Sequence, residues 1–275
     1  MASNSKHRTS PSPEPRSTGR GRARRSLSQN LLTDPAVARW IVRTARIDPD
    51  GLVVEVGAGE GMLTRALAPA CRRLLCYEID PVFAANLTAR HRDDPGVRIV
   101  RGDFLKAVPP DGPFSVVGNI PYAITSPIVD WCLRAPGLTS ATLITQREYA
   151  RKRTGGYGRW SRLTVQTWPR FDWRATGRIP RDRFRPVPGV DSAVLRIERR
   201  GSDLLPKKSL GAYRRLVDLG FTGVGGSLHA SLRRRHPARR VDAAFRAAGL
   251  DPRVVVGFVP PDRWIALFTA LEEPS

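Results

Sequence analysis

The stretch Asn119-Ile120-Pro121-Tyr122 brings an amide, a rigid turn and an aromatic ring together in four residues. It follows the apolar run 114–118, which predicts a buried strand that ends in glycine. An amide can accept a hydrogen bond from an exocyclic amine, proline fixes the backbone, and an aromatic ring can stack on a flat base. The stretch therefore predicts a loop that holds a nucleobase by its amine.

A glycine-rich turn lies earlier in the chain, at residues 57–61, with the sequence Gly-Ala-Gly-Glu-Gly. The apolar segment 52–56 before it predicts a strand buried on both faces, and a helix is predicted from Met62 to about Ala68. A strand, a glycine turn and a helix start indicate nucleotide binding, because Gly57 and Gly59 let the backbone turn tightly and approach a ligand. The motif alone is weak, since its spacing is not the dinucleotide pattern and no phosphate-gripping lysine follows.

Acidic residues follow the next predicted strand, 73–77, in the sequence Glu78-Ile79-Asp80. An acid about 20 positions after the glycine turn is where such folds hold a ribose diol, so Glu78 is the candidate for that contact. The alternative is that Glu78 caps the helix that starts at Pro81, a role that Asp80 can fill instead.

The third predicted strand, 97–100, leads to Asp103 and Phe104. Asp103 can accept a hydrogen bond from an adenine amine, and Phe104 can pack against the ring. Strand ends thus carry Gly57, Glu78, Asp103 and Asn119. Because ligands bind at the carboxyl ends of strands in an open α/β sheet, the four ends together predict a Rossmann-like α/β domain with a ligand site.

The chain divides into three predicted segments. Residues 1–26 are rich in Ser, Pro, Arg and Gly and should form a disordered basic tail. Residues 27–200 hold the motifs and should form the catalytic, cofactor-binding domain, with a helix opening at Asp34 and Pro35. Residues 201–275, with helices expected at 208–219 and 240–248, should form a small, basic, helical RNA-binding domain.

The charge balance points to a polyanionic partner. The 275 residues carry 46 Lys+Arg against 25 Asp+Glu, a net charge of +21, of which the tail supplies only six. Such a bias predicts binding to nucleic acid phosphates, although a high-GC genome that favours arginine codons is an alternative. The segment 147–162 interleaves basic residues with Tyr149, Tyr157 and Trp160, which suits unpaired RNA. Its alternative is a solvated helix face followed by a flexible loop.

Other features limit the function classes. Cys71, Cys76 and Cys132 lack the spacing of metal ligands, so we expect buried free thiols, no metal and a reducing cytoplasm. No apolar run is long enough to span a bilayer, and the N-terminus lacks the apolar segment of a secretory signal. A proline-rich loop at 179–192 carries Phe184 as its one large apolar residue, which is either a core anchor or a platform for stacking.

Taken as a set, these motifs resemble the ribosomal RNA adenine-N6 methyltransferases, and within them the Erm enzymes of actinobacteria. The resemblance runs from about residue 26 to the C-terminus and rests on segments 29–32, 55–61, 78–80, 102–105 and 119–122 and on the Phe184 loop. It implies S-adenosylmethionine as cofactor. It also implies methylation of one adenine in the peptidyl-transferase region of 23S rRNA, which blocks macrolides, lincosamides and streptogramin B.

The resemblance also assigns residues. The cofactor site would comprise Gln29, Asn30, Leu32, Gly57, Gly59, Glu78, Ile79, Asp103, Phe104 and Asn119. Glu78 would take the cofactor ribose and Asp103 its adenine, while Asn119 would sit by the methionine end and the target amine. The catalytic set would be Asn119, Ile120, Pro121, Tyr122 and Phe184. Leu32 departs from the phenylalanine of many relatives but stays apolar. The expected partner is 23S rRNA, free or in the assembling large subunit, bound by a monomer without a membrane or a metal.

Three alternatives share some of these motifs. A small-subunit (16S) rRNA dimethyladenosine transferase acting in ribosome assembly would usually carry leucine at position 120 and a different C-terminal domain, whereas 221–229 resembles the actinobacterial Erm pattern. A DNA adenine methyltransferase would lean towards proline at position 120. A non-catalytic RNA-binding relative is disfavoured by the intact Asn119 and Gly57 turn.

Overall fold

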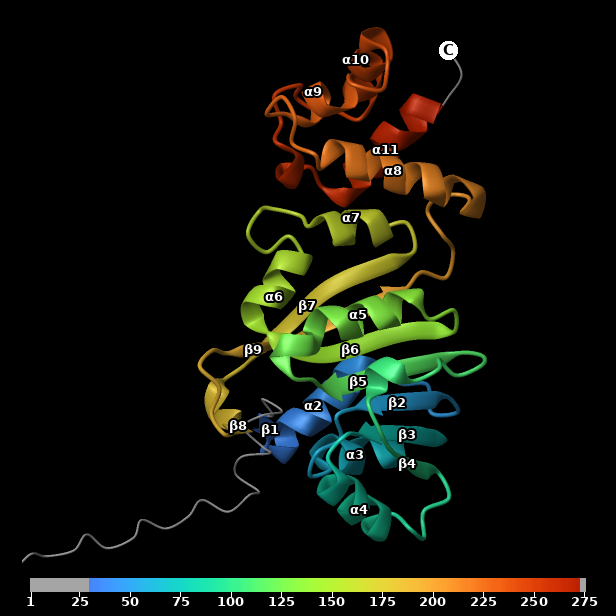
Figure 1. Ribbon diagram of the computed structural model, residues 1–275, viewed down its shortest axis with the longest axis vertical. Helices are drawn as coiled ribbons and strands as arrows, with labels where there is room; N and C mark the ends of the chain where they lie inside the picture. Colours follow the sequence, from blue (N-terminus) through green and yellow to red (C-terminus); the bar gives the residue numbers. More distant parts are fainter. Residues whose placement is uncertain (1–29, 273–275) are drawn as a thin grey trace, which may run out of the picture.

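A seven-stranded sheet forms the centre of the molecule in the computed structural model, which describes residues 30–272 (Figure 1). The strands are β2 (Leu52–Val56), β3 (Arg73–Glu78), β4 (Val97–Arg101), β5 (Phe114–Asn119), β6 (Leu138–Gln146), β7 (Phe171–Ile179) and β9 (Ser192–Arg199). Their order is β4-β3-β2-β5-β6-β9-β7, and the first five are parallel, whereas β9 runs antiparallel to both neighbours. The predicted tail at 1–26 and Gln29 lie outside the described residues.

Helices cover both faces of this sheet because successive strand side chains point to opposite sides. The covering helices are α2 (Pro35–Ala45), α3 (Met62–Leu67), α4 (Pro81–Arg90), α5 (Thr125–Arg134) and α6 (Arg147–Arg153). Val54 and Val56 pack in one cluster with Ile128 of α5, whereas Val53 packs in a second cluster with Ile41 of α2. The predicted doubly covered α/β arrangement is therefore confirmed.

Two helices begin as their sequences predict. Asp34 caps α2 by accepting a hydrogen bond from the Ala36 N–H at 2.8 Å, with Pro35 in the first turn. Asp80 caps α4 in the same way, accepting from the Val82 N–H at 2.8 Å. Each such cap contributes about 1 kcal/mol. Because Asp80 caps α4, the alternative in which Glu78 is the helix cap is wrong.

A two-stranded ribbon, β1 (Leu31–Leu32) with β8 (Phe184–Arg185), ties the start of the described chain to the proline-rich loop. Leu32 pairs with Phe184 in this antiparallel ribbon. The Thr33 N–H donates to the Arg183 carbonyl at 2.9 Å, and the Arg183 guanidinium contacts the Asp34 carboxylate at 2.9 Å. The ribbon joins segments 150 residues apart, and no sequence motif predicted it.

The C-terminal part is helical and has its own hydrophobic core. It comprises α8 (Leu210–Gly220), α9 (Leu228–Leu232), α10 (Ala238–Ala247) and α11 (Pro261–Glu272), which lie above the sheet in Figure 1. Trp264 is fully buried in this core, and the Tyr213 hydroxyl donates to the Val165 carbonyl of α7 (Arg162–Thr167) at 2.9 Å. The predicted helices are confirmed; a boundary at residue 200 stays a prediction, since α7 shares the C-terminal core.

Candidate active site

The four strand ends singled out by the sequence lie side by side, because β4, β3, β2 and β5 are consecutive parallel strands. A small pocket at this edge is lined by Asn30, Leu31, Gly57, Gly59, Glu78, Asn119, Ile120 and Pro121. The pocket therefore brings together seven of the fourteen predicted cofactor and catalytic residues. Leu31 is the member that the sequence analysis missed: it lines the pocket, whereas Leu32 beside it packs in the core.

The glycine turn needs glycine at three positions, the third being Gly61 with φ of 81°. Gly57 has φ of 71° and Gly59 has φ of 56°, a left-handed backbone that disfavours side chains. A Cβ atom on Gly59 would lie 2.8 Å from the Leu31 Cδ2 atom, so the turn packs closely against β1. The N–H groups of Gly57 and Ala58 both donate to the Tyr77 carbonyl, at 3.0 and 3.2 Å. The turn is thereby fixed to the end of β3, next to Glu78.

The Glu78 carboxylate is buried, with 1% of the residue exposed, yet both oxygens are satisfied. One accepts from the Gly59 N–H at 2.6 Å and the other from the Asp80 N–H at 2.8 Å. Burial raises the pKa of Glu78, and these backbone hydrogen bonds oppose the shift. Each carboxylate oxygen keeps a second lone pair, so a hydroxyl pair such as a ribose diol can still donate to it.

A second buried acid lies under the glycine turn. Glu55 is 1% exposed, and one of its oxygens accepts from the Thr64 hydroxyl at 2.7 Å and the Cys76 thiol at 3.2 Å. Burial raises the pKa of Glu55 to about 7. These contacts connect β2 to α3, which follows the glycine turn, and to the neighbouring strand β3. The sequence signal was an acid inside an otherwise apolar strand, and no role was predicted for it.

The orientation of the Asn119 amide follows from its hydrogen bond to Asn30. Its Nδ2 group donates to the Asn30 carbonyl at 2.7 Å. A carbonyl oxygen can only accept, so the nitrogen must face Asn30 and the side-chain oxygen points elsewhere. Asn30 directly precedes β1, which the ribbon with β8 holds in place. The amide oxygen of Asn119 is thus presented as an acceptor by contacts that span 89 residues.

Tyr122 is also held from a distant strand. Its hydroxyl lies 2.7 Å from the Ser192 hydroxyl at the start of β9, and burial raises the pKa of the phenol, so it stays protonated near neutrality. Tyr122 lies in the short helix η3 (Tyr122–Ile124), which Pro121 precedes. Both residues remain partly exposed. The Ile120 side chain is 2% exposed and packs in the core, so this residue can offer only its backbone to a base.

Phe184 lies in the core, and this corrects the expectation of a stacking platform. Its residue surface is 1% exposed, and the ring packs in the same cluster as Leu32 and Ile41. No face of the ring is open to a base in this structure. The structure thus agrees with the other interpretation, in which Phe184 anchors the loop in the core. The buried ring holds β8 and, because Phe184 pairs with Leu32, also the segment that contacts Asn119.

The remaining predicted cofactor residues lie outside the small pocket. Asp103 accepts from the Leu105 N–H at 3.0 Å at the start of η2 (Phe104–Lys106). The Phe104 ring is 5% exposed and packs on Trp131 with a centroid distance of 4.4 Å. Ile79 is 48% exposed. Contacts of Asp103, Phe104, Ile79 and Leu32 with a cofactor stay predictions.

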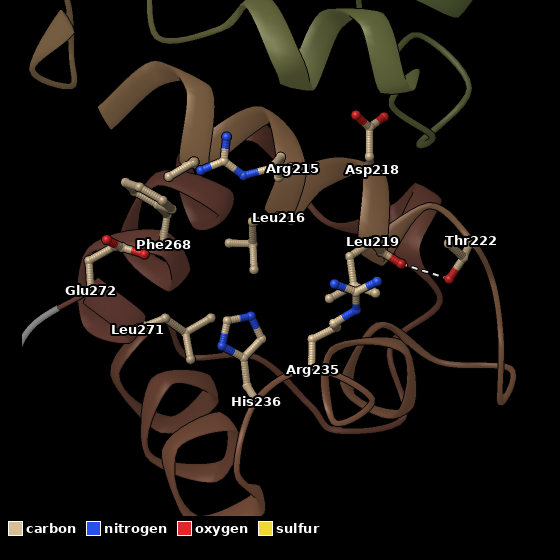
Figure 2. Close-up of a pocket in the computed structure, with 11 residues that line it drawn as sticks. Arg215, Leu216, Asp218, Leu219, Thr222, Arg235, His236, Phe268, Leu271 and Glu272 are labelled. Atoms are coloured by element: carbon tan, nitrogen blue, oxygen red, sulfur yellow. Dashed lines mark hydrogen bonds between the residues drawn. The ribbon is translucent and has the colours of Figure 1, made fainter. Parts of the chain in front are cut away.

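A larger pocket lies elsewhere, in the helical C-terminal part (Figure 2). Its volume is about 510 Å³, and Leu216, Leu219 of α8 and Phe268 of α11 give it an apolar lining. It belongs to α8 and α11 rather than to the strand ends. Within residues 30–272, there is no cluster of His, Cys, Asp and Glu that could hold a metal ion. No helix among the described residues is long and apolar enough to cross a bilayer.

The strand order, the glycine turn and the buried acid at the end of β3 define a Rossmann-like α/β enzyme that binds a nucleoside-type cofactor. Residues 20–273 match the family model described as ribosomal RNA adenine dimethylase, and the chain belongs to this family. Family membership confirms the predicted enzyme class, an rRNA adenine methyltransferase, and family and fold imply S-adenosylmethionine as methyl donor.

Individual relatives support the same class. An rRNA adenine N-6-methyltransferase of Streptomyces fradiae is 59% identical over 252 residues, covering 91% of this chain and 79% of that one. The crystal structure of the 23S rRNA methyltransferase ErmE matches with a TM-score of 0.86 and 50% identity, covering 89% of this chain and 100% of that one. A ribosomal RNA small subunit methyltransferase A of Thermobifida fusca is 35% identical over 244 residues, with 84% of each chain covered.

Proposed function

We propose that this protein transfers a methyl group from S-adenosylmethionine to N6 of a specific adenine in 23S rRNA, and thereby confers resistance to macrolides, lincosamides and streptogramin B. The likeness to ErmE and the higher identity to the Streptomyces enzyme than to the small-subunit enzyme support this choice of RNA. The protein would act in the cytoplasm, where ribosomes assemble, and it would act as a monomer.

The pocket residues fit the proposed cofactor. The turn presents no side chain at Gly57, where an added Cβ would meet only the Asn119 carbonyl oxygen at 3.5 Å, and the buried Glu78 carboxylate retains free lone pairs for a ribose diol. When bound, the cofactor supplies a methyl group already activated by its sulfonium centre. The chain therefore needs no metal or covalent intermediate, and its task is to position the acceptor amine.

Asn119 and the backbone after it would hold that amine. The lone pair of an adenine amine is delocalised into the ring, so the amine is a poor nucleophile until its hydrogens are held. The Asn119 amide oxygen, turned away from Asn30, would accept one amine hydrogen, and the Ile120 carbonyl would accept the other. Pro121 fixes the backbone that directly follows the Ile120 carbonyl. These contacts localise the lone pair towards the methyl donor.

Tyr122 would hold the plane of the target base. An adenine inside an RNA helix cannot be reached, so it must leave its stack and be received by a new partner. The Tyr122 ring remains partly exposed, and its hydroxyl contact with Ser192 fixes its position. The amine proton would be lost after methyl transfer, so no general base is assigned.

One observation carries the proposal: the Asn119 amide, oriented by Asn30, lies in the same small pocket as the glycine turn and Glu78. In this arrangement the Asn119 amide oxygen would serve as an acceptor for an exocyclic amine beside the proposed cofactor site. A nucleoside-binding protein that lacked transfer chemistry would have no need for an acceptor directed at that edge.

The direct test is incubation of the protein with radiolabelled S-adenosylmethionine and protein-free 23S or 16S rRNA, with primer extension to map the modified base. We expect label in 23S rRNA, confined to one adenine. Primer extension should stop at that adenine if both amine hydrogens are replaced, since an N6-monomethyl adenine still pairs. Label only in 16S rRNA would contradict the proposal and favour the small-subunit activity.

A further inference from the structure

Two loops from different parts of the chain meet beside the helical C-terminal part. The first, 154–161, joins α6 to α7, and the second, 254–258, precedes α11. The Trp160 N–H donates to the Gly257 carbonyl at 2.7 Å, and the Trp160 ring packs edge-on against Trp168 with centroids 5.7 Å apart. Trp160 is thus partly buried and links the two loops.

Two aromatic residues at this junction stay exposed. Tyr157 in the first loop and Phe258 in the second each have 47% of their surface open. A guanidinium lies over each ring: that of Arg151 is 4.1 Å from the Tyr157 centroid, and that of Arg159 is 4.8 Å from the Phe258 centroid. Each ring therefore has a cation on one face and substantial open surface. We call these four residues the Tyr157–Phe258 surface.

This surface lies within reach of the catalytic edge. Helix α6 begins at Arg147, directly after β6 ends, and β6 runs parallel to β5 with Ile144 opposite Asn119. The start of α6 is therefore on the same edge of the sheet as Asn119. The helix has seven residues, a length of about 10 Å, and it leads to the first loop. Figure 1 shows α6 rising from the sheet towards the helical part.

We propose that the Tyr157–Phe258 surface stacks unpaired bases of the RNA substrate that lie outside the target adenine. Proteins that hold single-stranded RNA combine aromatic faces with arginines along the backbone, and both components are present here on two chain segments about 100 residues apart. The inference rests on the proposed function, since it takes rRNA as the substrate.

The charges around the surface favour a polyanion, and the two open aromatic rings favour RNA among polyanions. Lys152 and Arg153 add positive charge next to Arg151, and the neighbouring Asp251 is already paired with Arg253 at 3.3 Å. The larger pocket in Figure 2 differs, because its arginines share the rim with the carboxylates of Asp218 and Glu272. The excess of positive charge together with two open rings distinguishes the Tyr157–Phe258 surface.

The test compares Tyr157→Ala, Phe258→Ala and the double variant with wild type, using a protein-free 23S rRNA transcript as probe. Loss of one stacked base should weaken RNA binding by roughly 5- to 150-fold per ring. The affinity for S-adenosylmethionine and the midpoint of thermal unfolding should not change, since both rings are exposed. The salt dependence of binding should keep its slope, because the rings neutralise no phosphate.

Matched variants make the result specific. Tyr157→Phe and Phe258→Tyr retain a ring and should recover most of the RNA affinity that the alanine variants lose. Leu204→Ala removes a comparably exposed apolar side chain, 44% open, from the linker before α8 and should leave RNA affinity at the wild-type value. The double alanine variant should bind a duplex RNA of equal length as the wild type does, since paired bases offer no free face.

Two outcomes would overturn the inference while the proposed function stands. One is a double variant that binds the 23S transcript within twofold of wild type. The other is an equal loss on single-stranded and duplex RNA, which would indicate a contact other than stacking. Failure of the wild-type protein to methylate 23S rRNA would instead refute the proposed function, so the two failures are distinguishable.

Discussion

The two halves of the active site are held together differently. In the cofactor half, the Gly59 N–H and the Glu78 carboxylate meet across 19 residues, on adjacent strands of one sheet. In the base half, Asn119 contacts Asn30 across 89 residues and Tyr122 contacts Ser192 across 70. The cofactor half is thus built by local strand–turn geometry, whereas the base half depends on hydrogen bonds to segments that are distant in the sequence. Substitutions should therefore separate cofactor binding from turnover.

The largest expected effect is that of Asn119→Ala in the base half. Removal of the acceptor for the amine should lower kcat by roughly 10³-fold, as for other groups that act on the transition state. The affinity for S-adenosylmethionine should change far less, because Glu78 and the glycine turn are intact. Turnover at saturating RNA and calorimetry with the cofactor give the two numbers. Near-normal methylation by this variant would refute the assignment.

Phe184→Ala tests how the base half is supported. The ring is fully packed, so its removal should lower the free energy of unfolding by about 3–5 kcal/mol, measured by urea denaturation. Phe184→Leu serves as the control: it keeps an apolar anchor, should cost less stability and should retain most of the turnover. A leucine variant that is stable but has a strongly reduced kcat would contradict a purely structural role. It would indicate that the Phe184 ring contacts the target base.

Glu55→Gln tests the support of the cofactor half through pH. The pKa of Glu55 is raised to about 7 in the fold, so between about pH 4.5 and 7 the folded protein binds more protons than the unfolded chain. The free energy of unfolding should therefore fall as pH rises through this window, by about 3 kcal/mol from this group. The variant should lose this part of the slope in urea titrations at pH 5 and pH 8. Glu148→Gln, an exposed acid on α6, is the control; an unchanged slope in Glu55→Gln would contradict the burial argument.

Glu78→Gln should have a smaller effect, confined to the cofactor. An amide nitrogen cannot accept from the Gly59 or Asp80 N–H groups or from a ribose hydroxyl, so one of the observed contacts is lost. We expect S-adenosylmethionine to bind about 10- to 100-fold more weakly, or about 2 kcal/mol, by calorimetry. Asp80→Asn preserves the helix cap and should bind the cofactor normally. Equal weakening in both variants would mean that Glu78 has no specific role.

The same difference explains what could be predicted from the sequence. Gly57, Glu78, Asp103 and Asn119 each lie at the end of their own strand or within two residues of it, so the apolar run predicts both the strand and the approximate position of the residue at its end. The ribbon of β1 and β8 could not be predicted, because strands of two residues show no periodicity and their pairing depends on the tertiary structure.

Finer errors have physical causes as well. Adjacent residues of a strand face opposite sides, so the sequence alone could not decide whether Leu31 or Leu32 lines the pocket. Phe184 and Trp160 look like exposed aromatics because their neighbours are polar or proline-rich, yet Phe184 packs in a core cluster with Ile41, and Trp160 packs, partly buried, against the C-terminal core. The contact of Phe258 with Arg159 joins two such loops and could not be inferred from either.

The central claim is that the loop from Asn119 to Tyr122 directs a methyl group to an exocyclic amine. Its most direct test is to methylate 23S rRNA with the protein, digest the RNA to nucleosides and identify the product by chromatography and mass spectrometry. We expect N6-methyladenosine or N6,N6-dimethyladenosine as the product. Methylation at a ring nitrogen or ring carbon of adenine, or on another base, would contradict it.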